Sequence, residues 1–216
     1  MPSPSARDRA GPLERPSAMM GDNRPYVLAI GDSLTAGYGL ATHEAFPARL
    51  QALLRAQHAQ AVVQNAGLSG DTSASALARL PRLLSSLARL PDLAIVELGA
   101  NDLLRGVSPR RTRANLDAIL GELARCGIPT LIAAMEAPRF LGAFAHACDA
   151  VYADLAARHG IPVWPFFPAG VLGNRALTLP DRLHPNARAI ALVARHMLPA
   201  VLGAIANKGR TAGIAA

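Results

Sequence analysis

Five short apolar runs, each followed by a segment with helical spacing, constrain the fold of this chain more than any other feature. The first, third and fourth runs consist mostly of Leu, Ile, Val and Ala, which is typical of parallel strands that helices cover on both faces. Two prolines in the fifth run predict an edge strand. The expected strands are residues 26–30, 61–65, 93–98, 130–135 and 161–165.

The segments between these runs carry apolar residues on one helical face, as Phe46, Leu50 and Leu54 do after the first run. Within the second helical segment, Pro81 predicts a kink or a break. The expected helices are residues 44–58, 73–90, 110–126, 141–159 and 186–204. Strand–helix repeats of this kind predict an α/β fold: a three-layer α/β/α domain with a five-stranded parallel sheet of the doubly wound, flavodoxin-like type.

The length and composition favour one domain. The chain has 216 residues, of which 51% are hydrophobic, and this is enough for one sizeable core. Residues 1–24 and 207–216 have the composition of flexible tails, so the folded domain is expected at 25–206. Cys126 and Cys148 are the only cysteines, and both are interpreted as small buried thiols, with a disulfide left open.

The net charge of +7 comes almost entirely from arginine, because Lys208 is the only lysine. These arginines are scattered along the expected helices, so nucleic acid is not an expected partner. No stretch approaches the roughly 18 apolar residues of a membrane span, and we expect no integral membrane segment. The N-terminus lacks the apolar core of a secretory signal, even with a start at Met19 or Met20, which favours the cytoplasm.

Four polar segments follow expected strands, and each carries one chemically useful group. They contain Ser33, Gly70, Asn101 and His184. Alone, each has an ordinary interpretation as a helix cap or a turn. Because ligands of such sheets bind beyond the carboxyl ends of the strands, we expect the four residues to meet at one edge.

Together these groups are the parts that acyl transfer needs. Asp181 stands three residues before His184, so its carboxylate can orient the imidazole that activates Ser33. The backbone N–H of Gly70 and the side-chain amide of Asn101 can donate to a developing oxyanion. Such a mechanism requires no metal ion and no organic cofactor.

The motifs GDSLTAGYG, NAGLSGDTS followed by LARLP, VELGANDLLRG and DRLHPN resemble the four blocks of the SGNH (GDSL) hydrolase superfamily. Within it, the chain is most similar to the bacterial arylesterase, acyl-CoA thioesterase I and lysophospholipase group, over about residues 26–203. The resemblance implies Ser33, Asp181 and His184 as catalytic residues, with Ser33, Gly70 and Asn101 forming the oxyanion hole. Typical members of that group are exported, so a periplasmic location stays open.

Apolar residues near the expected site favour a small-molecule ester or thioester with an acyl chain or aryl group. A carbohydrate deacetylase or acyltransferase would favour a polar rim instead. A nucleotide-binding protein would need a glycine pattern that GDSLTAGYGL does not contain. A degenerate hydrolase that only binds ligands is the third alternative, although all four blocks are intact. The expected substrate-binding residues are Leu34, Leu103, Leu104, Pro138, Phe140 and Phe166.

Several other titratable residues are expected to have structural roles. Asp32, Asp71 and Asp102 are expected to brace the site loops by accepting backbone N–H groups. Glu97 lies in a buried strand and needs a partner that the sequence does not identify. The remaining histidines are interpreted as surface or capping residues without a matched acid: His43, His58, His146, His159 and His196.

Overall fold

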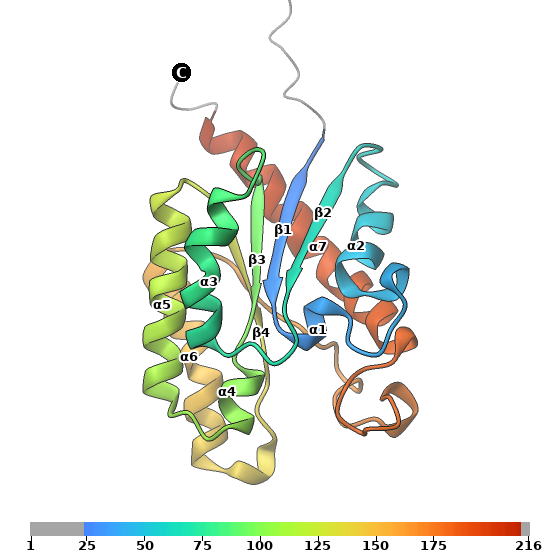
Figure 1. Cartoon of the computed structure of the whole chain (residues 1–216), viewed down its shortest axis with the longest axis vertical. Helices are drawn as coiled ribbons and strands as arrows, with labels where there is room; N and C mark the ends of the chain where they lie inside the picture. The colour runs from blue at the N-terminus through green and yellow to red at the C-terminus, as the bar shows by residue number, and fades with distance from the viewer. Residues whose placement is uncertain (1–23, 213–216) are drawn as a thin grey trace, which may run out of the picture.

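The computed structural model describes residues 24–212, and the side chains of residues 24–207. Its centre is one parallel sheet with the strand order β2-β1-β3-β4-β5 (Figure 1). The five-stranded sheet is therefore confirmed, with β5 at one edge. The strands are β1 (Tyr26–Gly31), β2 (Val62–Gly67), β3 (Leu93–Glu97), β4 (Thr130–Ala134) and β5 (Val163–Pro165).

Helices cover both faces of this sheet, which confirms the three-layer arrangement (Figure 1). Short 3₁₀ turns precede α2, α6 and α7 in the described part of the chain: η1 (Thr42–Glu44), η2 (Arg139–Leu141) and η3 (Arg175–Leu177). The α-helices are α1 (Ser33–Ala36), α2 (Phe46–Leu54), α3 (Ser73–Ser85), α4 (Ala100–Leu104), α5 (Pro109–Arg125), α6 (Ala143–His159) and α7 (Ala187–Ala212).

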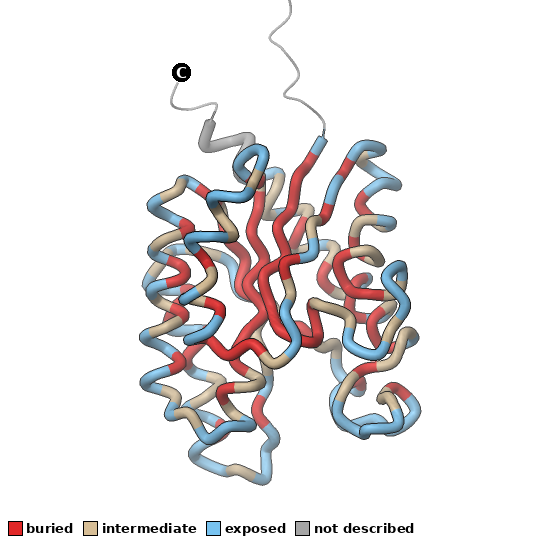
Figure 2. The backbone as a smooth tube through the Cα atoms, viewed as in Figure 1, coloured by how far each residue is buried: buried red, intermediate tan, exposed pale blue. Residues whose placement is uncertain are grey.

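The central strands are mostly apolar because each face packs against a different helix layer. In β1, Val27 and Ala29 belong to a core cluster shared with α2 and α7. Leu28 and Ile30 belong to a second cluster shared with α3, α5 and α6. Both clusters are buried, as Figure 2 shows for the red centre of the molecule. Alternate side chains of one strand thus fill two separate cores.

Several helices differ from the sequence expectation: α1 and α4 were not expected, α2 ends at Leu54 instead of residue 58, and α3 and α7 end elsewhere than expected. Pro81 lies inside α3 without ending it, and the helix stops at Ser85, before the expected boundary at residue 90. At the other end of the chain, α7 continues to Ala212, past residue 207, where a tail was expected. Residues 1–23 and 213–216 of the expected tails lie outside the described residues.

One described helix, at Ala187–Asn207, is long and apolar enough by length and composition to cross a membrane. The expectation that no stretch approaches this length was therefore wrong. The core helix of a globular protein passes the same test, and α7 packs against α2. Its side chains Ile190, Val193, Met197 and Val201 are completely buried in the core. This packing accounts for the apolar residues on the buried face of α7.

Candidate active site

The four polar segments meet at the carboxyl edge of the sheet. Ser33 begins α1 directly after β1, and Asn101 lies in α4 directly after β3. Gly70 lies between β2 and α3, and His184 lies just before α7. All four line one cavity of about 870 Å³. The expected convergence of these residues is what the fold produces.

Ser33, His184 and Asp181 form an unbroken chain of hydrogen bonds. The Nε2 atom of His184 lies 3.0 Å from Oγ of Ser33, and Nδ1 lies 2.7 Å from Oδ2 of Asp181. The ring of Tyr38 covers the imidazole, with a distance of 4.4 Å between ring centroids. These distances allow a proton to pass from the serine hydroxyl to the imidazole.

The turn that carries Asp181 keeps its carboxylate ionised. Its Oδ1 atom accepts the backbone N–H groups of Leu183 and His184, each at 3.0 Å. These bonds and the imidazole of His184 lower the pKa of Asp181 to about 2, and the bond from Leu183 has the largest effect. Arg182 completes the turn with φ of 60°, the one positive φ among the described non-glycine residues. The carboxylate is therefore fixed on the imidazole before substrate binds.

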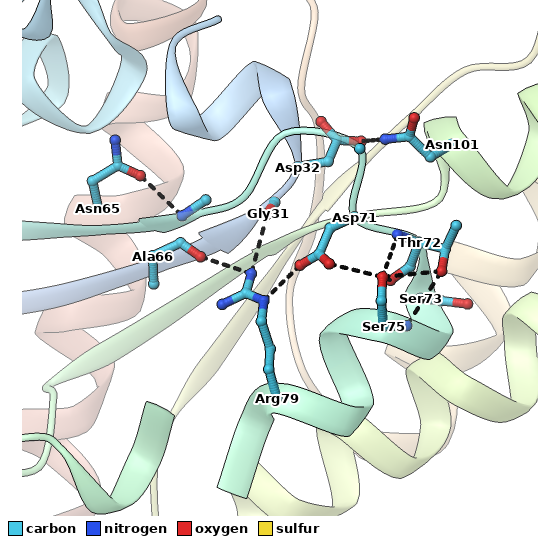
Figure 3. A network of polar contacts seen from close by, with 12 residues as sticks. Gly31, Asp32, Asn65, Ala66, Asp71, Thr72, Ser73, Ser75, Arg79 and Asn101 are labelled. Carbon is cyan, nitrogen blue, oxygen red and sulfur yellow. Dashed lines mark hydrogen bonds and ion pairs between the residues drawn. The ribbon is translucent and has the colours of Figure 1, made fainter. Parts of the chain in front are cut away.

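The two expected oxyanion donors are each held by a second group. The side-chain amide of Asn101 donates to Oδ2 of Asp32 at 3.0 Å, which leaves its other N–H available (Figure 3). The peptide of Gly70 has φ of 83°, which favours glycine, and Arg105 donates to its carbonyl oxygen at 2.9 Å. Each donor is therefore held in place by a hydrogen bond to a neighbouring residue, Asp32 for Asn101 and Arg105 for Gly70.

Two completely buried acids lie behind the serine. Asp32 accepts the backbone N–H of Leu34 at 2.9 Å, and burial raises its pKa to about 6. Glu97 accepts the hydroxyl of Thr35 at 2.8 Å, and burial together with the charge of Asp32 raises its pKa well above the usual range. Thr35 is thus the partner that the sequence did not identify for Glu97.

A polar network braces the loop that carries Gly70 (Figure 3). Asp71 accepts Nε of Arg79 at 2.6 Å and the hydroxyl of Ser75 at 2.7 Å. Arg79 also donates to the carbonyl oxygens of Gly31 and Ala66, at 3.3 and 2.8 Å. The loop is thereby tied to the ends of β1 and β2.

The expected bracing by the aspartates takes two forms. Asp32 accepts a backbone N–H as expected, and so does Asp102, which takes the N–H of Ser73 at 2.7 Å. Asp71 differs, because its carboxylate accepts from the side chains of Ser75 and Arg79.

Comparison with known proteins decides the family. Residues 29–192 match the model of the GDSL-like lipase/acylhydrolase family. The chain belongs to this family. It is therefore a hydrolase of acyl ester or thioester bonds, and the resemblance read from the four sequence blocks is confirmed.

Several members of the GDSL-like family are similar over most of this chain. Esterase TesA of Pseudomonas aeruginosa is 37% identical, covering 74% of this chain and 79% of its own length. Thioesterase 1/protease 1/lysophospholipase L1 of Escherichia coli is 36% identical, covering 79% and 80% respectively. The crystal structure of AlinE4, an SGNH-hydrolase family esterase, is 44% identical, covers 84% of this chain and 96% of its own, and has a TM-score of 0.70.

Five of the six expected substrate-binding residues line the cavity, and one does not. Leu34, Leu103, Leu104, Pro138 and Phe140 are in its wall. Phe166 was predicted wrongly, because it is completely buried and packs edge-on against Phe46 in the core. Its neighbour Phe167 faces the cavity instead.

Other cavity residues were missed because they lie in irregular or distant segments. Tyr38 was part of a recognised block but was read only as loop. The tyrosine of α6, Tyr152, lines the cavity and donates to the carbonyl oxygen of Leu98 at 3.0 Å. Val171 and Leu172 come from the segment after β5, which has no periodicity to reveal them.

Two smaller expectations are corrected. His159 has an acid partner, because its Nε2 atom lies 2.6 Å from Oδ1 of Asp117. This pair joins α6 to α5, so no short sequence spacing could reveal it. Cys126 and Cys148 are free and half-buried, and Cys148 lines the cavity.

Proposed function

We propose that this chain hydrolyses esters or thioesters of apolar acyl groups, with Ser33 as nucleophile and His184 as general base. The observation that carries the proposal is the continuous chain from Ser33 through His184 to Asp181, opening into a cavity with a mainly apolar lining. Relatives named esterase, thioesterase and lysophospholipase support the same class of reaction.

In the first half of the reaction, His184 accepts the hydroxyl proton as the oxygen of Ser33 bonds to the acyl carbon. The carbonyl π electrons move to oxygen, and the N–H groups of Ser33, Gly70 and Asn101 donate to the resulting anion. The anion then collapses, the bond to the leaving alcohol or thiol breaks, and the imidazolium gives that group its proton. Asp181 stabilises the imidazolium throughout.

In the second half, water replaces the alcohol or thiol. His184 takes a proton from water as the water oxygen bonds to the acyl carbon. The ester bond to Ser33 then breaks, the serine regains its proton from His184, and the carboxylic acid leaves. The chemistry needs only the groups named here and water.

A carbohydrate deacetylase is the second enzyme candidate, and the cavity wall disfavours it. Leu103, Met135, Phe167 and Val171 present apolar surface to the cavity that Ser33 lines. A sugar ring would leave its hydroxyls unpaired against such a wall.

The direct test is labelling with a fluorophosphonate probe, combined with hydrolysis of p-nitrophenyl butyrate. We expect the wild-type chain to be labelled and active, and Ser33→Ala to lose both properties while keeping its melting temperature. Asn101→Ala should still be labelled, but slowly. Near-normal hydrolysis by purified Ser33→Ala would contradict the proposal.

A further inference from the structure

A group of large apolar side chains surrounds the mouth of the cavity and is open to solvent. The most exposed is Phe140, at 87%, followed by Leu104 at 62%. Isolated apolar residues on a surface are ordinary, whereas a cluster around one opening points to an interaction. We call this cluster the mouth collar; its members, all exposed and all lining the cavity, are Tyr38, Leu104, Phe140, Leu172 and Leu183.

The mouth collar occupies one end of the molecule. Its residues come from the turn after α1, from α4, from η2 and from the segment between β5 and α7. In Figure 1, α4, the η2 segment and the segment before α7 project beyond the carboxyl ends of the strands. The start of β1 and the end of α7 lie at the opposite end of the molecule. An extended surface could therefore approach the mouth without meeting the rest of the domain.

Arginines accompany the mouth collar. Arg175 and Arg182 line the cavity, and Arg105 lies beside Gly70. Within residues 24–207, no ion pair to a carboxylate is found for these three side chains. Few acids lie nearby to offset these arginines. Glu136 is an exposed acid in the cavity wall, and Asp181 is paired with His184.

One more arginine of the region is already neutralised. Arg139 in η2 is paired with Asp149, with 3.1 Å between Nη1 and Oδ2. Asp32 also lines the cavity but is completely buried at its base. The exposed charge around the mouth is thus positive, in agreement with the net charge of +7 of the whole chain.

We propose that the mouth collar docks on the surface of an anionic lipid bilayer. Apolar side chains at the level of the acyl–headgroup boundary, with arginines beside lipid phosphates, are the two features that hold proteins at such a surface. The cavity is continuous with the collar, so an acyl chain enters it from the bilayer without crossing water. A second copy of this chain is a poorer occupant, because docking mouth to mouth brings the arginines of both copies together.

The test uses the full chain carrying Ser33→Ala, so that lipid is not consumed. Binding is measured by co-flotation with vesicles of phosphatidylcholine alone and of equal parts phosphatidylcholine and phosphatidylglycerol. We expect binding to the anionic vesicles that weakens with added salt. Phe140→Ser should reduce partitioning by about tenfold or more, and Arg175→Ser by about fivefold.

Matched controls come from the opposite end of the sheet. Leu90 is 60% exposed in the connection that enters β3, and Arg82 is exposed near the end of α3. Leu90→Ser and Arg82→Ser should leave vesicle binding unchanged. Melting temperatures of all variants establish that each remains folded.

Three results overturn the docking proposal: no binding to anionic vesicles, no loss with Phe140→Ser, or an equal loss with Leu90→Ser. A wild-type dimer that Phe140→Ser dissociates, without vesicle binding, identifies a self-association face and also overturns it. Because binding is measured with Ser33→Ala and hydrolysis with a soluble ester, failure of docking is distinguishable from failure of the proposed function.

Discussion

The side-chain amide of Asn101 donates to the buried carboxylate of Asp32 at 3.0 Å, joining the residues that follow β3 and β1. Asp32 is itself fixed, because its other oxygen accepts the backbone N–H of Leu34 at 2.9 Å. One N–H of the Asn101 amide is therefore bonded to Asp32. Because the amide group is planar, this bond also fixes the direction of the second N–H. Asp32 acts on the oxyanion site as a positioning residue.

Asp32→Asn is expected to lower kcat and to change the pH dependence of stability. An asparagine supplies one acceptor and one donor, so it cannot accept from both Leu34 and Asn101. The amide of Asn101 then loses its fixed orientation, and we expect kcat to fall by roughly 10- to 100-fold, with little change in KM.

The stability effect of Asp32→Asn has a definite sign. Burial raises the pKa of Asp32 from 3.8 to about 6, so the folded state holds this proton more tightly than the unfolded state. The contribution of Asp32 to the stability of the wild-type protein is fully present below pH 3.8. It is lost as the pH rises through about 6. Relative to wild type, the variant should gain about 2 kcal/mol between pH 4 and pH 7, measured by urea unfolding. An unchanged difference across that range would contradict the role given to Asp32.

Asn101→Ala removes the donor itself. We expect kcat to fall by roughly 10²–10³-fold, because the amide is needed when charge develops on the substrate oxygen. KM should change far less. Steady-state kinetics on a soluble p-nitrophenyl ester measure both, and a rise in KM with unchanged kcat would assign Asn101 to substrate binding only.

The sequence was sufficient for the fold and for the shared edge of the site. Continuous apolar strands ending in polar turns identify a doubly wound sheet, and such a sheet brings Ser33, Asn101 and His184 together. The partners of buried charges could not be predicted in the same way. Thr35 in α1 reaches Glu97 at the end of β3, and Asp117 in α5 reaches His159 in α6. Contacts of this kind depend on packing, which leaves no spacing signal in the chain.

Asp181→Asn tests the orientation of the imidazole. The pKa of Asp181 is lowered to about 2, first by the N–H of Leu183, so the carboxylate is ionised throughout the usual assay range. We expect kcat to fall by roughly 10²–10⁴-fold in the variant. Wild-type stability contributed by this carboxylate is present above about pH 4 and is lost as the pH falls towards 2. The melting temperature of the variant should therefore fall less than that of wild type as the pH is lowered from 5 to 2. Melting temperatures across this range measure the difference.

Arg79→Leu tests the bracing of the loop that carries Gly70. The guanidinium bonds to Asp71 and to the carbonyl oxygens of Gly31 and Ala66, and Asp71 is almost completely buried. Removing one partner of a buried pair should reduce the free energy of unfolding by about 3 kcal/mol. Arg82→Leu, one turn later and exposed, is the matched control and should change it by less than about 0.5 kcal/mol. Equal effects of the two substitutions would show that the network does not stabilise the loop.

Phe166 and Phe167 are adjacent, yet they face different environments. Phe166 is completely buried against Phe46, whereas Phe167 lines the cavity. Phe166→Ala should therefore cost about 3–5 kcal/mol of stability and leave the preferred acyl length unchanged. Phe167→Ala enlarges the cavity and should move the preference towards longer chains.

A series of p-nitrophenyl esters from acetate to laurate separates the two phenylalanine variants. With the wild-type chain, each added CH₂ that is buried in the cavity should raise kcat/KM about fourfold until the cavity is full. The chain length at which this increase stops should be the same in wild type and Phe166→Ala, and greater in Phe167→Ala. A wild-type preference for acetate would contradict an apolar acyl site. A shift in Phe166→Ala alone would mean that the wall of the acyl site is formed by the core cluster rather than by Phe167.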